Sequence, residues 1–158
     1  MKPIIPVALI FLMIVLGCGN FKNLSQRSAS KNPYQGKLAD LLPEELSSGL
    51  IKFKLVGTVN NDEMQEAKES KRLTYMQQAA GVEIKVDGAL ANYSSSAEAN
   101  AKLADIAKKS NVPLSKKGDG QRVTAPDGTI GWTNGSLLCI VKAGVAKAAT
   151  NFEDAALF

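Results

Sequence analysis

Two dipeptides, Asp127-Gly128 and Asn134-Gly135, divide the C-terminal part of the chain into short apolar segments. Asp-Gly and Asn-Gly are the pairs that two-residue β-hairpin turns favour, because both residues of such a turn take positive φ angles. The two turns limit each apolar segment to the length of a short strand. The sequence therefore predicts an antiparallel meander of three strands, at 122–125, 129–133 and 136–143.

Three more strands are predicted nearer the N-terminus, at 50–59, 72–79 and 82–93, because apolar and polar residues alternate there. The alternation is clearest from residue 82, where Val82, Ile84 and Val86 are each followed by a charged residue. Gly81 precedes this strand and suits a tight hairpin turn. Gly88 interrupts it, which predicts a bulge or bend at that point.

Two amphipathic helices are predicted. Ser95 and Glu98 form a capping-box pattern, so the first helix should begin at Ser96 and end near residues 110–113. Its apolar stripe consists of Ala99, Leu103, Ile106 and Ala107. The second helix, near the C-terminus, has a stripe formed by Val145, Ala149, Phe152 and Ala156.

The predicted order of elements is β-β-β-α-β-β-β-α, within one domain at residues 37–158. This order predicts an α+β fold: a two-layer sandwich with a mostly antiparallel sheet of five to six strands and both helices on one face. At the start of the domain, residues 37–48 have a partly helical spacing of leucines that Pro43 interrupts. We expect a short helix or turn there, covering a sheet edge, and a loop or one or two exposed helical turns at 61–70.

The N-terminus has the features of an export signal. Lys2 supplies a positive charge, and residues 4–16 are apolar throughout. This run of 13 residues is shorter than the ~20 residues that a membrane-spanning helix needs. Residues 1–17 are therefore expected to be a signal peptide rather than a permanent transmembrane segment.

The apolar run ends in Val15-Leu16-Gly17-Cys18, which resembles the lipobox of bacterial lipoproteins. The resemblance implies cleavage before Cys18, a diacylglycerol on its sulfur and acylation of the new amino terminus, with chains of the palmitate type. Two or more acyl chains anchor a protein stably to a membrane. The resemblance does not extend to the folded domain, whose family is not recognised.

The segment that follows, residues 18–36, carries the cysteine and then reads as a flexible tether rich in Asn, Ser, Gln and Gly. The implied location is the cell envelope. Gly19 is not the aspartate that retains well-studied lipoproteins in the inner membrane, which favours the periplasmic side of the outer membrane in a cell with two membranes.

Composition excludes several classes of function. The chain has no histidine and two cysteines, which excludes Ser-His-Asp and Cys-His catalytic units and the usual zinc sites. Residues 37–158 contain 15 basic and 15 acidic residues, so a basic face for nucleic acid is not expected. Asp62, Glu63, Glu66 and Glu69 lack the spacing of a calcium loop and are interpreted as a solvated face. We expect no enzyme activity and no cofactor.

Two functions stay open. The first is a noncatalytic binding or adaptor domain that meets an envelope protein through a sheet face, the 116–120 loop or the Asn134-Gly135 turn. The alternative is a carrier or sensor with an apolar pocket near Trp132 and Tyr93. The candidate contact residues are therefore Trp132, Asn134 and Tyr93. Trp132 and Tyr93 are also expected to be strand aromatics, and Cys139 a small buried hydrophobic residue.

Overall fold

The computed structural model describes residues 33–79 and 81–156. Its elements in chain order are the 3-10 helix η1 (Leu38–Leu41), β1 (Glu45–Ser48), β2 (Ile51–Asn60), β3 (Glu69–Ala79), β4 (Val82–Asn92), α2 (Ser96–Lys109), β5 (Ser115–Lys117), β6 (Gly120–Thr124), β7 (Ile130–Asn134), β8 (Leu137–Ala143) and α3 (Ala146–Ala155). The α+β class is confirmed. Cys18, the signal peptide and most of the tether lie outside the described residues.

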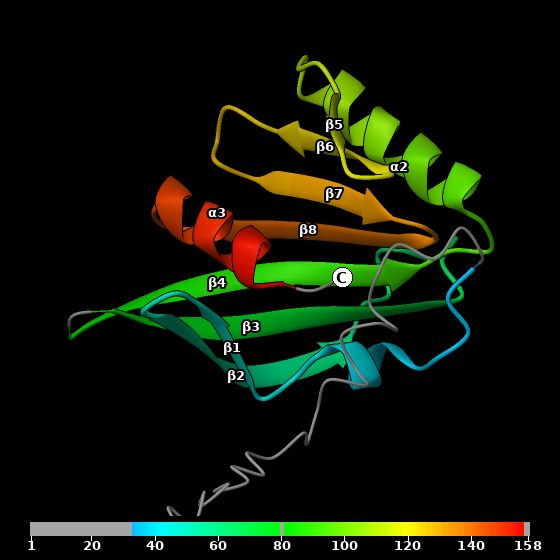
Figure 1. Cartoon of the computed structure of the whole chain (residues 1–158). Coiled ribbons are helices and arrows are strands. Elements are labelled where there is room, and N and C mark those ends of the chain that lie inside the picture. Colours follow the sequence, from blue (N-terminus) through cyan, green and yellow to red (C-terminus); the bar gives the residue numbers. More distant parts are fainter. Residues whose placement is uncertain (1–32, 80, 157–158) are drawn as a thin grey trace, which may run out of the picture.

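The strands form one antiparallel sheet in the order β1-β2-β3-β4-β8-β7-β6-β5 (Figure 1). The predicted count of five to six strands is wrong, because the described chain forms eight. The six predicted strands are present as β2, β3, β4, β6, β7 and β8. The additional strands are the two edges, β1 with four residues and β5 with three.

The two helices pack on opposite faces of the sheet, so the prediction that they share one face is wrong. Residues paired across antiparallel strands point to the same face. Cys139 of β8 is paired with Trp132 of β7, and both lie in the core that contains Phe152 of α3. The next residue, Leu138, points the other way and lies in a second cluster with Leu103 of α2. The sheet is therefore the middle layer between α3 and α2 (Figure 1).

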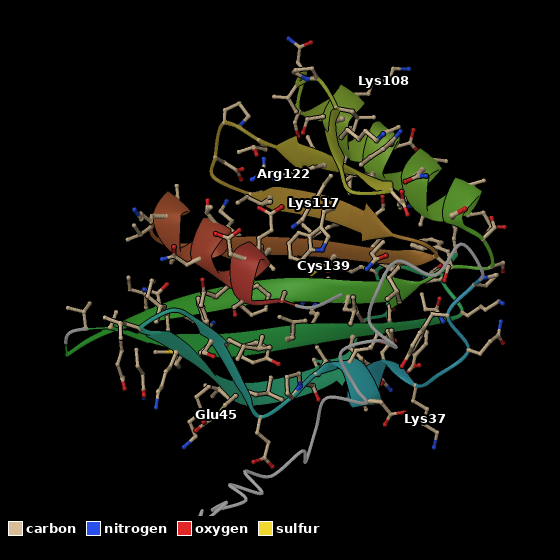
Figure 2. All side chains as sticks on the ribbon, viewed as in Figure 1. Lys37, Glu45, Lys108, Lys117, Arg122 and Cys139 are labelled. Carbon is tan, nitrogen blue, oxygen red and sulfur yellow. The ribbon has the colours of Figure 1, made fainter. Side chains whose placement is uncertain are left out.

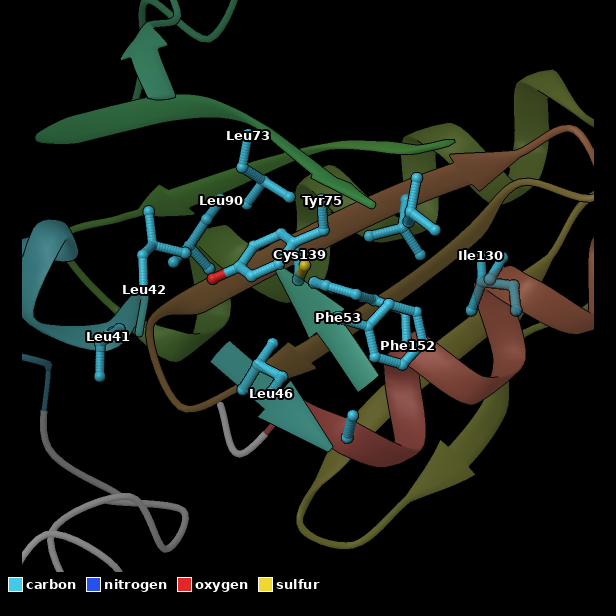
Figure 3. Close-up of a cluster of buried hydrophobic side chains, with 14 of the residues drawn as sticks. Leu41, Leu42, Leu46, Phe53, Leu73, Tyr75, Leu90, Ile130, Cys139 and Phe152 are labelled. Atoms are coloured by element: carbon cyan, nitrogen blue, oxygen red, sulfur yellow. The ribbon is translucent and has the colours of Figure 1, made fainter. Parts of the chain in front are cut away.

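The larger core lies between the sheet and α3. Phe152 meets Phe53 of β2 edge-to-face, with ring centroids 5.4 Å apart, and Tyr75 of β3 at 5.1 Å. The three rings are fully buried and lie together in Figure 3. The Tyr75 hydroxyl donates a hydrogen bond to the Pro43 carbonyl oxygen at 2.8 Å, which satisfies its polar atom inside the core.

The predicted bulge at Gly88 is wrong, because β4 pairs with β3 and β8 without a register shift there. A Cβ atom on Gly88 would lie 2.8 Å from the Ile140 carbonyl oxygen, so this glycine allows a close approach of neighbouring backbones. Apolar residues lie on both faces of β4 after Gly88, because Leu90 belongs to the core under α3 and Ala91 to the cluster under α2. The described bulge lies in β2, between Leu55 and Gly57.

Hairpin turns lie at both predicted places, but only the glycine of each pair has a positive φ angle, so the predicted geometry with two positive φ angles is wrong. Asn134 pairs with Leu137, which makes Gly135 and Ser136 the two residues of the β7–β8 turn. Gly128 and Gly135 have φ angles of +82° and +58°, which are values that side-chain-bearing residues rarely adopt. The capping box before α2 is modified: Ser95 Oγ accepts a hydrogen bond from the Glu98 N–H, whereas Glu98 Oε2 accepts from the N–H of Ser94. The expected short helix within residues 37–48 is present as the 3-10 helix η1, and the strand β1, which was not predicted, follows it. The four leucines of this segment are buried.

The residues just before η1 are held against the end of the sheet. Tyr34 N–H donates to Ser136 Oγ at 2.8 Å, and Asn92 Nδ2 donates to the Tyr34 carbonyl oxygen at 2.9 Å. Ser136 and Asn92 are buried and bonded to each other at 2.8 Å. Hydrogen bonds of Tyr34 thus hold the segment before η1 against the domain, beside the β7–β8 turn. In the described part of the chain, no helix is long and apolar enough to cross a membrane.

Candidate functional site

A hollow of about 400 Å³ lies where the β5–β6 hairpin, β7 and the C-terminal end of α3 meet. Two of the three candidate residues, Trp132 and Asn134, line it, and so do residues 117–120 of the predicted loop. The fold therefore places the 117–120 loop next to Trp132 and Asn134, which the sequence did not predict to be neighbours. The volume is within the range of small-ligand sites, roughly 300–1,000 Å³.

Glu153 of α3 is the polar centre of this site. Its side chain is 4% exposed, and its Oε1 accepts hydrogen bonds from Lys117 Nζ and Arg122 Nε, each at 2.7 Å. Arg122 Nη2 donates to Oε2 at 2.8 Å, so the guanidinium binds the carboxylate through two nitrogens. Figure 2 shows Lys117 and Arg122 near each other, on the neighbouring strands β5 and β6.

The two cations keep Glu153 charged. Burial alone would raise the pKa of the Glu153 carboxyl, but the hydrogen bonds from Arg122 and Lys117 outweigh burial and hold that pKa below its ordinary value. The same hydrogen bond from Arg122 raises the pKa of the guanidinium above its already high ordinary value. The cluster of Lys117, Arg122 and Glu153 therefore carries one net positive charge at neutral pH.

Trp132 is a core residue that also borders the hollow. It is 1% exposed, and it shares its sheet face with Ile130, which confirms the expectation of a strand aromatic. The Lys117 ammonium lies over the indole ring, 4.7 Å from its centroid. Lys117 therefore contacts an aromatic face and a carboxylate at once, which is a favourable environment for a cation.

The rest of the lining is rich in hydrogen-bond acceptors. Asn134 Oδ1 is buried and has no hydrogen-bond partner among the described residues. The carboxylates of Asp119 and Asp154 line the hollow, together with Ala156 at the C-terminal end of α3. A helix C-terminus carries partial negative charge on its free carbonyl groups. The buried side-chain atom of the lining that has no partner in the described chain is therefore an acceptor.

Tyr93, the third candidate, does not belong to this hollow. It lies in the cluster under α2, on the opposite sheet face from Trp132. The expectation of one pocket near both aromatic residues is wrong, because the sheet separates them. The Tyr93 hydroxyl is buried without a hydrogen-bond partner in the described chain, and burial raises its pKa. No described residue pairs with it in a way that suggests chemistry.

The other singled-out residues have structural roles. Cys139 is buried in the larger core, and burial raises the pKa of its thiol, so it is the inert hydrophobic residue that was expected. Acidic residues in the 61–70 segment form contacts of their own: Glu66 pairs with Lys102 at 3.0 Å, and Glu69 accepts from the Leu38 N–H at 3.0 Å. Within residues 33–79 and 81–156, no group of His, Cys, Asp and Glu could hold a metal ion.

A sheet face is the other predicted binding surface, and β3 and β4 present an exposed one. Its polar groups satisfy one another: Asp87 accepts from Thr74 Oγ1 at 2.8 Å and pairs with Lys85 at 2.9 Å. Exposed, mutually paired charges of this kind are typical of a solvated sheet face. The hollow beside Trp132 is the better candidate, since it combines burial with an unpartnered polar atom.

Glu153 is a residue of the candidate site that the sequence pattern did not predict. It lies four residues after Ala149 and three before Ala156, so it falls on the apolar stripe of its helix. A carboxylate on such a stripe needs a buried partner, which is the signal that could have found it. Comparison of the chain with protein-family models, curated proteins and solved structures found no match.

Proposed function

We propose that the chain is a lipid-anchored protein of the bacterial cell envelope whose α+β domain binds a partner without catalysing a reaction. The lipobox-like Val15-Leu16-Gly17-Cys18 supports the anchor. The hollow beside Trp132 supports the binding role, and it is the single observation that carries that part of the proposal. In a cell with two membranes, the proposed location is the periplasmic side of the outer membrane, because Gly19 rather than an aspartate follows the cysteine.

The way the chain joins the domain fits this proposal. Tyr34 is bonded to Ser136 in the β7–β8 turn, and Asn134 of the hollow belongs to the strand that enters the same turn. The tether is thus attached at the end of the sheet where Asn134 lies. A partner in the hollow would then lie at the end of the sheet where the tether joins the domain.

A small-ligand carrier is the second candidate, and the volume of the hollow favours it. The two functions differ in what occupies the site. A carrier retains a small molecule through purification, whereas an adaptor is joined to a protein in the cell. Native mass spectrometry of the purified full chain distinguishes them, because a retained small molecule adds a defined mass.

The anchor is tested by Cys18→Ser. We expect the full-length protein to be in the membrane fraction and the variant to leave it, because the serine cannot form the thioether to diacylglycerol. Intact mass should show the loss of residues 1–17 and the gain of lipid in the unsubstituted protein only. Unchanged membrane attachment of Cys18→Ser, or a processed chain without lipid mass, would contradict the anchor.

The binding surface is tested by in-cell crosslinking of the tagged protein. We expect Asp119→Lys, which reverses an exposed charge at the hollow, to reduce capture of a specific envelope protein at least about tenfold, an effect of about 1.4 kcal/mol. Asp62→Lys makes the same charge change on the exposed 61–70 segment and should leave capture unchanged. Equal capture by both variants would exclude the hollow as the contact surface.

A further inference from the structure

We propose that the hollow binds an alkylammonium group, carried by a lysine side chain or by a free amine, at the place where Lys117 Nζ now lies between Trp132 and Glu153. The inference rests on the proposed function, since it assigns a ligand chemistry to the same site. The geometry itself shows an ammonium in this position. Lys117 Nζ is 2.7 Å from Glu153 Oε1 and 4.7 Å from the centroid of the Trp132 ring.

The two contacts define the class of ligand. A carboxylate at 2.7 Å accepts a charge-assisted hydrogen bond, and an indole face attracts a cation through its quadrupole. Glu153 is 4% exposed and Trp132 is 1% exposed, so little water competes for either contact. A neutral hydroxyl can still donate a hydrogen bond to the carboxylate, but it carries no positive charge for the ion pair or for the contact with the indole face.

A ligand ammonium can displace the Lys117 side chain without leaving the negative charge of Glu153 unpaired. Its side chain is 35% exposed, and it belongs to β5, the three-residue strand at the edge of the sheet. When Lys117 moves away, Arg122 still binds both oxygens of Glu153. The internal lysine therefore acts as a competitor for the ligand rather than as an irreplaceable part of the core.

The space next to Lys117 is suited to the remaining N–H groups of such a ligand. An ammonium has three donors, and Glu153 and the indole account for only part of them. Asn134 Oδ1 offers a buried acceptor that has no described partner. Asp119 and Asp154 add negative charge at the same hollow, and α3 ends there. These groups favour a cation over a neutral ligand of the same size.

The test is titration of the full chain in detergent micelles, monitored by the fluorescence of Trp132, which is the only tryptophan. The probes are cadaverine and the peptide Gly-Lys-Gly with an acetylated N-terminus and an amidated C-terminus, and their counterparts without an ammonium are 1,5-pentanediol and Gly-Met-Gly capped in the same way. We expect saturable changes with the ammonium probes only. A tighter response to the peptide indicates a lysine-bearing partner, and a tighter response to cadaverine indicates a free amine.

Lys117→Met removes the internal ammonium and keeps an apolar stem of similar length. We expect it to bind the preferred probe about tenfold more tightly, because the competitor is gone. Lys116→Met, on the neighbouring exposed position, should bind like the unsubstituted chain. The inference is overturned if the unsubstituted chain binds neither ammonium probe, if the neutral counterparts bind equally well, or if Lys117→Met shows no gain. Crosslinking to a partner would survive that outcome, so the two proposals fail separately.

Discussion

Phe152→Ala is expected to lower the free energy of unfolding by about 4 kcal/mol, within the range for removing a large buried ring. Phe152 has no exposed surface and is the side chain through which α3 meets Phe53 and Tyr75 (Figure 3). The variant loses apolar burial and leaves a cavity between the helix and the sheet. Urea unfolding monitored by circular dichroism measures the change.

Leu50→Ala is the control for this prediction. Leu50 is 98% exposed, so its truncation should change the free energy of unfolding by less than about 0.5 kcal/mol. Similar losses for the two variants would contradict the packing of α3 on this face. The hollow shares the same helix through Glu153, so Phe152→Ala should also shift the fluorescence of Trp132 in the folded state.

The strands and helices were predictable where a long pattern exists. Alternation from residue 82 gave β4, and the glycines of the two Asx-Gly turns gave the meander. The edge strands were not predictable from the sequence. The strand β5 has three residues and β1 has four, and segments of this length are too short to show a period. Their pairing depends on neighbours that the local sequence does not identify.

The placement of the helices shows a different limit. An apolar stripe indicates which side of a helix is buried, but not which face of the sheet receives it. The sequence contains the needed clue in β8, where Leu137, Leu138 and Cys139 are apolar in succession. A run without alternation indicates a strand that is covered on both faces. That strand is the one between α3 and α2.

The candidate site was predictable in part. Turn chemistry and aromatic character indicated Trp132, Asn134 and the 116–120 loop. Trp132, Asn134 and residues 117–120 of that loop meet at one hollow. Tyr93 was predicted to lie near the same pocket because it is an aromatic residue of a predicted strand, but it lies in the cluster under α2, on the other face of the sheet. Glu153 was missed because its partners, Lys117 and Arg122, are more than thirty residues away in the sequence.

Arg122→Met is expected to lower the free energy of unfolding by about 3 kcal/mol at neutral pH, the lower limit for breaking a buried ion pair. The variant keeps an apolar side chain of similar length but removes the two hydrogen bonds to Glu153. Glu153 would remain buried with Lys117 as its only partner in the cluster. Thermal and urea unfolding of the full chain provide the measurement.

Arg72→Met is the matched control, because Arg72 pairs with Glu63 through side chains that are 51% and 77% exposed. Such a surface pair contributes at most about 1 kcal/mol, so the control should cost clearly less than Arg122→Met. Equal losses in the free energy of unfolding for Arg122→Met and Arg72→Met would mean that burial of Glu153 does not strengthen its ion pairs.

The pH dependence of the free energy of unfolding shows whether the charge on Glu153 stabilises the fold. The pKa of Glu153 is lower in the folded chain than its ordinary value of 4.5, so its contribution is fully present above pH 4.5 and is lost as the pH falls through the folded-state pKa. Unfolding at about pH 3 should therefore show a smaller difference between the unsubstituted chain and Arg122→Met than unfolding at neutral pH. A difference that stays constant with pH would assign the effect of Arg122 to packing of its side chain. It would then leave the charge on Glu153 without a role in holding β5, β6 and α3 around the hollow.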